Sequence, residues 1–330
     1  MKVLGMGNAL VDIMTELPDD RLLNELGLRK GSMQLVDKDF SNQVMQRVRP
    51  FIKGEISGGS AANTVCGLAA MGVRTAFIGK VGKDRLGEIF EKDLVHNGIH
   101  PYLLYSDTET GHALALVSPD SERTFATHLG AAVELEPTDL IPDMFQGYTH
   151  FYIEGYLVQH HELIRRAVEL AQENKMEVIL DLASFNIVED HLDFLHFLVK
   201  EYADVVFANS DEARVYSNGK EPEKALAEIA KDCWIAVVKT GKYGSLIQNG
   251  KQVFHVTATK ANCIDTTGAG DLYAAGFLYG MLNGLHLPLC GEVGSILAGK
   301  VIGMIGARIP DKTWPEIENL VKKVTYKQLV

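Results

Sequence analysis

Residues 265–277, with the sequence DTTGAGDLYAAGF, combine a glycine-rich turn, two carboxylates and the predicted start of a helix. Backbone N–H groups in the first turn of a helix have no intrahelical partner, and together with the helix dipole they form a site for anions. If the helix begins near Gly270, the N–H groups of Gly268, Ala269 and Gly270 form such an anion hole. Asp271 would lie beside it, where it could take a proton from an attacking hydroxyl. The pattern therefore predicts transfer of a phosphoryl group to an alcohol, which depends on positioning and charge neutralisation.

A simpler interpretation of the same turn is purely structural. Glycine permits the turn, and an aspartate in the first turn of a helix complements the helix dipole. For the four residues GAGD alone this structural interpretation is favoured, so the chemical interpretation needs a second signal elsewhere in the chain.

A second pair of glycines precedes another predicted helix, in SGGSAANTVCGLAAMG (57–72). Gly58 and Gly59 would let a polar ligand approach the backbone, and Ser60 would cap the helix. Asn63, in the first turn, can both donate and accept hydrogen bonds, which suits a sugar hydroxyl. A tight strand-to-helix turn packed with small residues explains the same pattern, and this alternative stays open.

Strand-like and helical segments alternate along most of the chain, and these elements must position the two turns. Such alternation is typical of an α/β fold with a mostly parallel central sheet flanked by helices on both faces. Two regions, roughly 13–56 and 100–128, depart from it and contain polar, strand-like pieces that predict a small second sheet. The chain of 330 residues is interpreted as one domain, 1–330. Strands are predicted at 2–7, 75–82, 150–155, 177–182, 205–209, 235–241 and 244–248, and helices at 60–72, 160–175 and 221–232.

Composition argues against several classes of partner and compartment. The formal net charge of −11 gives no general attraction to nucleic acid or to anionic membranes, so neither is expected as a partner. The most apolar stretch, 293–307, is too short to span a bilayer and contains Lys300, which favours a buried helix. The N-terminus lacks the apolar core of a signal peptide, and the four cysteines form no CxxC pair, so we expect a cytoplasmic protein with reduced thiols.

Taken together, GGSAAN and DTTGAGD resemble the two signature regions of the PfkB, or ribokinase-like, family of carbohydrate and nucleoside kinases. The resemblance extends from GNALVDI (7–13) to GARIP (306–310). It implies a ribokinase-like fold in which the irregular regions form a small β lid that closes over the substrate and excludes water. It also implies that Asp271 is the catalytic base and that the turn before it is the anion hole. The positions that match substrate contacts in the family are Asp12, Gly58, Gly59 and Asn63.

The resemblance further implies ATP and Mg²⁺ as cofactors. Asn209 and Glu212, in NSDEA, match the family's Asn-x-x-Glu element, which places Mg²⁺ and its waters near the phosphates. A helix cap followed by an acidic first turn would look the same. Thr240, Gly241 and Gly244, in KTGKYG, match the turn that approaches ATP, although alone they indicate only a glycine hairpin turn.

A monovalent cation such as K⁺ is a further expectation that comes from the resemblance. Asp265 and Thr267, with backbone near Gly306, match positions that bind such a cation in many relatives.

The substrate is the least determined feature. The segments GNALVDI and KGSMQLVD look most like the adenosine kinase branch, which implies ATP-dependent phosphorylation of the 5′-hydroxyl of adenosine. A sugar kinase acting on ribose, fructose or another hexose is the alternative, and a non-catalytic sensor of nucleotide or sugar is a third hypothesis. Tyr156 could stack on a base or be a buried core tyrosine, and Phe125 and His128 could face the substrate. Arg123 could pair with phosphate or lie on the surface. An exposed lid strand could pair with a second subunit, so a homodimer through the lid is also left open.

Two other nucleotide-binding patterns are absent from the sequence. GMGNAL begins like a dinucleotide fingerprint, but Leu10 stands where the third glycine is required, so the NAD interpretation is disfavoured. No G-x-x-x-x-G-K-[ST] occurs, since Lys80 and Lys300 are each followed by valine, and a P-loop kinase is therefore disfavoured.

Overall fold

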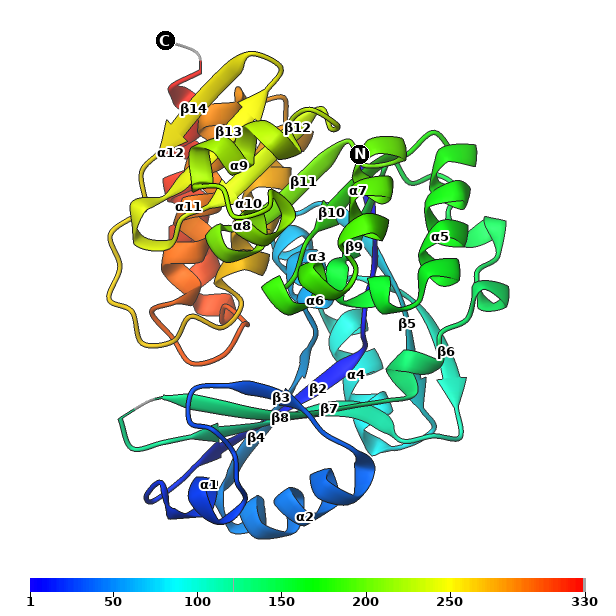
Figure 1. Cartoon of the computed structure of the whole chain (residues 1–330). Helices are drawn as coiled ribbons and strands as arrows, with labels where there is room; N and C mark the ends of the chain where they lie inside the picture. Colours follow the sequence, from blue (N-terminus) through cyan, green and yellow to red (C-terminus); the bar gives the residue numbers. More distant parts are fainter. Residues whose placement is uncertain (121, 329–330) are drawn as a thin grey trace.

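A nine-stranded sheet forms the larger part of the protein, and a five-stranded sheet lies beneath it in the view of Figure 1. The computed structural model describes residues 1–120 and 122–328. The large sheet has the strand order β14-β13-β12-β11-β10-β9-β1-β5-β6 and is parallel except for the hairpin formed by β13 and β14. Its strands are β1 (Lys2–Met6), β5 (Arg74–Gly82), β6 (His100–Ser106), β9 (His150–Glu154), β10 (Glu177–Asp181), β11 (Val205–Asn209), β12 (Ile235–Lys239), β13 (Ser245–Asn249) and β14 (Gln252–Val256).

Helices cover both faces of this sheet because its central strands are apolar on both sides. Adjacent residues of one strand, such as Val3 and Leu4, are fully buried in two different cores. The first core lies against α3 (Ser60–Ala70), α4 (Arg85–His96), α10 (Ala269–Leu282), α11 (Leu287–Val301) and α12 (Trp314–Tyr326). The second lies against α5 (His161–Glu173), α6 (Phe185–Asp190), α7 (Leu192–Glu201), α8 (Ser210–Tyr216) and α9 (Pro222–Ile229).

The small sheet is the predicted β lid, with the strand order β3-β8-β7-β2-β4. Helices α1 (Arg21–Glu25) and α2 (Lys38–Val48) cover one of its faces, and the other face is turned toward the large sheet (Figure 1). Its strands are β2 (Leu10–Glu16), β3 (Met33–Leu35), β4 (Ile52–Gly58), β7 (Thr110–Val117) and β8 (Arg123–Gly130).

The predicted bounds of the lid need correction. Residues 100–106 form β6, which pairs in parallel with β5 at the edge of the large sheet, so the predicted lid segment 100–128 is wrong at its start. The first segment, predicted as 13–56, extends to 10–58 because β2 and β4 pair from Leu10 and Gly58. Neither β6 nor the lid strands differ strongly in polarity from the residues around them, so these strands look alike in sequence.

The other expectations for the elements agree with the structure. All seven predicted strands are present within two residues of their bounds, and the three predicted helices are α3, α5 and α9. The apolar stretch 293–307 is a buried helix up to Val301, with its start at Leu287. Among the described residues, no helix combines the length and the hydropathy that a membrane span requires.

Candidate active site

The carboxyl ends of the parallel strands carry the polar residues that converge on the start of α10. Glu154 ends β9, Asp181 ends β10, Asn209 ends β11 and Lys239 ends β12. In open α/β sheets this edge is where ligands bind, because the loops and helix starts gather there. Helix α10 begins at Ala269, one residue before the predicted position.

Asp271 is held in place by two side chains of α3. Ser60 Oγ donates to Asp271 Oδ1 at 2.7 Å, and Asn63 Nδ2 donates to Oδ2 at 2.9 Å. Burial raises the pKa of Asp271 to about 6, although these two hydrogen bonds act in the opposite direction. A carboxylate with such a pKa is ionised at neutral pH and is basic enough to accept a proton from a hydroxyl.

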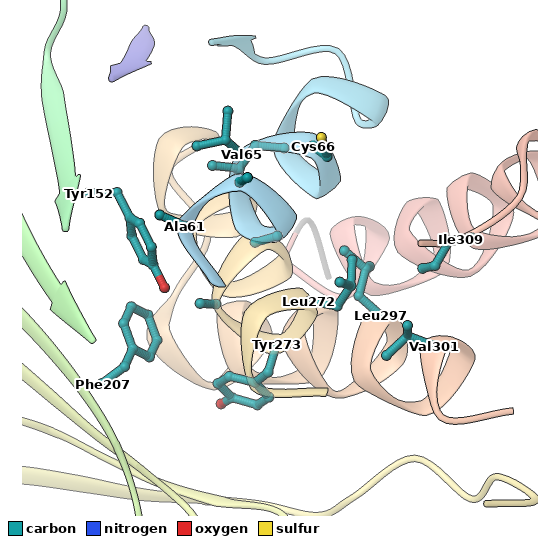
Figure 2. Packing of buried hydrophobic residues seen from close by; sticks show 14 of the residues in the cluster. Ala61, Val65, Cys66, Tyr152, Phe207, Leu272, Tyr273, Leu297, Val301 and Ile309 are labelled. Atoms are coloured by element: carbon teal, nitrogen blue, oxygen red, sulfur yellow. The ribbon is translucent and has the colours of Figure 1, made fainter. Parts of the chain in front are cut away.

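The two helices can bring these side chains together because they pack closely. Figure 2 shows α3, labelled at Ala61, Val65 and Cys66, beside α10, labelled at Leu272 and Tyr273. A Cβ on Gly67 would lie 2.9 Å from Leu272 Cδ1, so glycine is needed there for the close approach. The predicted cap at Ser60 is wrong, since the cap residue is Gly59 and the Ser60 hydroxyl serves Asp271 instead.

In the turn before α10, which was predicted to form an anion hole, one of the three amides is already engaged. Gly268 has a φ of +73°, and a Cβ on it would lie 2.5 Å from Ala307 Cβ, so only glycine fits. The N–H of Ala269 donates to the Thr266 carbonyl at 3.1 Å. Within residues 1–120 and 122–328, no hydrogen bond is made by the N–H of Gly268 or Gly270. These two amides are therefore the ones available to an anion, and Ala269 would contribute only if its bond to Thr266 opened.

Lys239 adds a positive charge at the same helix start, which the sequence interpretation missed. Its Nζ donates to Asp181 Oδ2 at 2.8 Å, and a Cβ on Gly270 would lie only 3.2 Å from that Nζ. Burial lowers the pKa of Lys239, but the Asp181 and Glu212 carboxylates outweigh it and hold the pKa above its usual value. Its sequence signal was the lysine in VVKTG, at the last position of a buried strand.

Glu154 is a second residue that the sequence interpretation missed. Its Oε1 accepts from the backbone N–H and from Nδ2 of Asn8, both at 2.9 Å, and its Oε2 accepts from Ala61 N at 2.8 Å. Burial raises the pKa of Glu154 to about 7 against these hydrogen bonds. The carboxyl group thus fixes the end of β1 against the start of α3, which carries Ser60 and Asn63.

Asp12 lies on the lid, on the face turned toward the large sheet. A Cβ on Gly58 would lie 2.5 Å from Asp12 Oδ1, and a Cβ on Gly59 would collide with the Asn8 carbonyl. Gly59 also has a φ of +92°, so both predicted substrate glycines are required by close packing. Burial raises the pKa of Asp12 to about 6, although the Arg308 guanidinium favours the ionised form.

Asp265 is fully occupied by neighbours from three segments. Its Oδ1 accepts from the N–H and the hydroxyl of Thr267, at 3.0 and 2.8 Å. Its Oδ2 accepts from Gly306 N at 2.7 Å and lies 2.6 Å from Nη1 of Arg123. Arg123 is the first residue of β8, so it reaches from the lid to the anion-hole turn and is buried there, not on the surface.

Asn209 and Glu212 form the helix cap that was the alternative to a metal site. Asn209 Oδ1 accepts from Glu212 N at 3.0 Å, while Glu212 Oε2 accepts from Asn209 N at 2.7 Å. Burial raises the pKa of Glu212, and the Asp181 carboxylate adds to that rise. The carboxylates of Glu212, Asp181 and Asp271 all act on the ammonium of Lys239. Among the described residues, no group of three or more His, Cys, Asp or Glu side chains is placed to hold a metal ion directly.

The turn between β12 and β13 contains the three residues predicted to approach ATP. Gly241 has a φ of +59° and faces open space, whereas a Cβ on Gly244 would collide with the Val256 carbonyl. Thr240 N donates to the Gly244 carbonyl at 2.8 Å, which closes the turn. Gly244 is thus explained by the fold alone, and Gly241 is the position that leaves room for a ligand.

The aromatic candidates separate into two groups. Phe125 lies on the same face of β8 as Arg123, toward the site, because alternate residues of a strand share a face. His128 lies on the opposite face, with its ring 5.7 Å from that of His112, so its predicted place toward the substrate is wrong. Tyr156 follows the end of β9, and its hydroxyl is 3.5 Å from the Ala183 carbonyl.

The comparisons with known proteins agree with this geometry. Residues 37–314 match the model of the pfkB family carbohydrate kinases. The chain is 36% identical to the adenosine kinase from Sinorhizobium meliloti, with a TM-score of 0.87 over 97% of this chain and 99% of that one. It is 34% identical to a probable sugar kinase protein from Rhizobium etli, with a TM-score of 0.89 over 98% of both chains. The 5-dehydro-2-deoxygluconokinase of Geobacillus thermodenitrificans is 29% identical over 287 residues, which cover 81% of this chain and 84% of that one.

The predicted fold is therefore confirmed, since the solved relatives share it over nearly the whole chain. Asp271, the glycine turn before α10 and the lid lie together in the structure. On the family match and this arrangement, the chain belongs to the pfkB family of carbohydrate kinases, as a sugar or nucleoside kinase.

Proposed function

We propose that the protein transfers the γ-phosphoryl group of Mg²⁺-ATP to the 5′-hydroxyl of adenosine. Asp271 accepts the proton of the hydroxyl, and the amides of Gly268 and Gly270 receive the phosphoryl oxygens. Lys239 adds positive charge beside the same amides. Asp12, with Asn63, holds the vicinal hydroxyls of the ribose.

The observation that carries the choice of adenosine is the apolar face of the lid around Asp12. Residues paired across neighbouring strands share a face, so the register identifies what surrounds Asp12. Apart from Asp12, Thr127 and Arg123, and Glu16 at the exposed end of β2, that face is mostly apolar, which suits the flat surface of a purine base. Its apolar members are Leu10, Met14, Met33, Leu35, Ile56, Ala113, Ala115 and Phe125.

A sugar kinase is the second candidate, because two of the similar proteins are named as kinases of sugars or sugar acids. A sugar acid needs a cation for its carboxylate. Arg123 is paired with Asp265, and Arg308 donates to the Ser57 carbonyl at 3.2 Å and lies 3.5 Å from Asp93. Both arginines therefore already have partners, which disfavours a sugar acid. Neutral sugars remain compatible with Asp12 and Asn63.

ATP and Mg²⁺ belong to the same proposal. Thr240, Gly241 and Gly244 would line the nucleotide, with Gly241 providing the open side. Asn209 and Glu212 would hold Mg²⁺ through water, and the cation would neutralise charge on the phosphates. A homodimer through the lid edge at β3 is a further expectation, which the molar mass from light scattering tests.

The experiment is an ADP-release assay with Mg²⁺-ATP against adenosine, inosine, guanosine, cytidine, ribose and fructose. Preference for adenosine supports the proposal, and preference for a free sugar replaces adenosine by the second candidate. Binding of ligands without any turnover would favour the sensor. In the Phe125→Ala variant, the loss of a base contact should raise the KM for adenosine about tenfold, with a much smaller effect on ribose.

A further inference from the structure

The carboxylate of Asp265 has no acceptor position left for a metal ion. An ionised carboxylate offers about four lone-pair positions. Two of these accept from the N–H and hydroxyl of Thr267, and the other two face Gly306 N and Arg123 Nη1. The donors around Asp265 therefore do not fit the monovalent cation that was expected there, and we derive no step through such an ion.

The charge at this place is already supplied by the protein. The side chains of Arg123 and Asp265 are only 7% and 5% exposed, so solvent screens their 2.6 Å ion pair weakly. Arginine stays charged even when burial lowers its pKa. A second cation against Asp265 would lie beside the guanidinium and be repelled by it.

The pair also joins two parts of the site that are distant in sequence. Arg123 begins a lid strand, while Asp265 opens the turn that leads to Gly268. Arg123 Nη1 also donates to Thr267 Oγ1 at 3.3 Å. Arg123 Nη2 is buried and has no hydrogen-bond partner within the described part of the chain.

We propose that Arg123 is a positioning residue that takes the place of a monovalent cation beside Asp265, so that the anion-hole turn is held without K⁺. The catalytic consequence rests on the proposed kinase function. The structural part does not, because the ion pair itself joins the turn to the lid.

The test compares KCl, NaCl and choline chloride at equal ionic strength, using turnover with Mg²⁺-ATP and, separately, the Tm of the protein without substrate. The wild-type protein should respond to K⁺ by less than about twofold in kcat and by no resolvable shift in Tm. Arg123→Ala should lose about tenfold or more in kcat, and K⁺ or added guanidinium should restore part of this and raise Tm. Arg85→Ala, which removes an exposed arginine at the start of α4 that is paired with Glu55 of the lid strand β4, is the matched control and should gain no cation response.

Wild-type protein that K⁺ activates about tenfold over choline would overturn the proposal. So would a folded Arg123→Ala variant that neither K⁺ nor guanidinium affects. If that variant does not fold, the comparison of salts on the wild-type protein still decides. Failure of the proposed function would appear differently, as no turnover on any acceptor in any salt, and the Tm comparison would still test the ion pair.

Discussion

Replacing Glu154 with glutamine should flatten the dependence of stability on pH. Glu154 is 1% exposed and its pKa is raised from 4.5 to about 7, chiefly by burial. Because the folded pKa lies above the unfolded one, the folded state binds the proton more tightly. The stabilisation is complete below pH 4.5 and is lost as pH rises through about 7.

The size of the effect follows from these two pKa values. Between about pH 5 and about pH 8, ionisation of Glu154 should lower the free energy of unfolding by about 2.5 kcal/mol. Glutamine does not titrate, so the variant should lack this loss. The substitution should also lower the free energy of unfolding by about 1–3 kcal/mol at every pH. The NH2 group of glutamine cannot accept a hydrogen bond, so either Asn8 N or Ala61 N loses its acceptor.

The assay is urea unfolding of both proteins at several pH values in this range. The informative quantity is the wild-type free energy of unfolding minus that of the variant, because Asp12 and Asp271 also titrate near pH 6 in both proteins. Glu169→Gln, on the exposed side of α5, is the matched control and should leave this difference constant. Parallel curves for wild type and Glu154→Gln would refute the assignment of a raised pKa to this buried carboxyl.

Two further predictions concern Gly244 and Lys239. Gly244→Ala should destabilise the protein by about 2 kcal/mol or more in thermal unfolding, because φ is +103° and the added Cβ collides with Val256. Gly250→Ala, where the Cβ enters open space, should destabilise it less, and equal effects of the two variants would contradict this. Lys239→Met should lower kcat by about 10²-fold at saturating ATP, because it removes the charge beside the proposed anion hole and leaves Asp181 unpaired. An unchanged kcat with a raised KM for ATP would assign Lys239 to ground-state binding instead.

The local signals in the sequence were sufficient to predict the strands and helices of the large sheet and the two glycine turns. The strands of the large sheet are short apolar runs bounded by turns, and Gly59 and Gly268 adopt positive φ at the two helix starts as those turns require. Alternation of strands and helices then places both starts at the same edge of a parallel sheet. The residue pattern alone is therefore enough to expect Asp271 and Asn63 near each other.

The contacts that tune the site were beyond such reasoning because they join distant segments. Asn63 and Asp271 are 208 residues apart, and Asn8 and Glu154 are 146 apart. Arg123 is an unremarkable strand residue in sequence, and nothing local indicates its pairing with Asp265. The burial of Glu154 and the carboxylates around Lys239 both result from the packing of several elements, so the raised pKa values of these two residues could not be read from residue types.

The single-turnover rate of Asp271→Asn decides whether Asp271 is the base in a phosphoryl transfer. The introduced amide can still accept the hydrogen bond from Ser60 Oγ. It can also donate to Asn63 Oδ1, which is buried without a partner in residues 1–120 and 122–328. The variant should thus bind ATP and acceptor as wild type does, which calorimetry checks. Its rate of ADP formation should fall by about 10²–10⁴-fold. A rate near that of the wild type, with binding intact, would contradict the account.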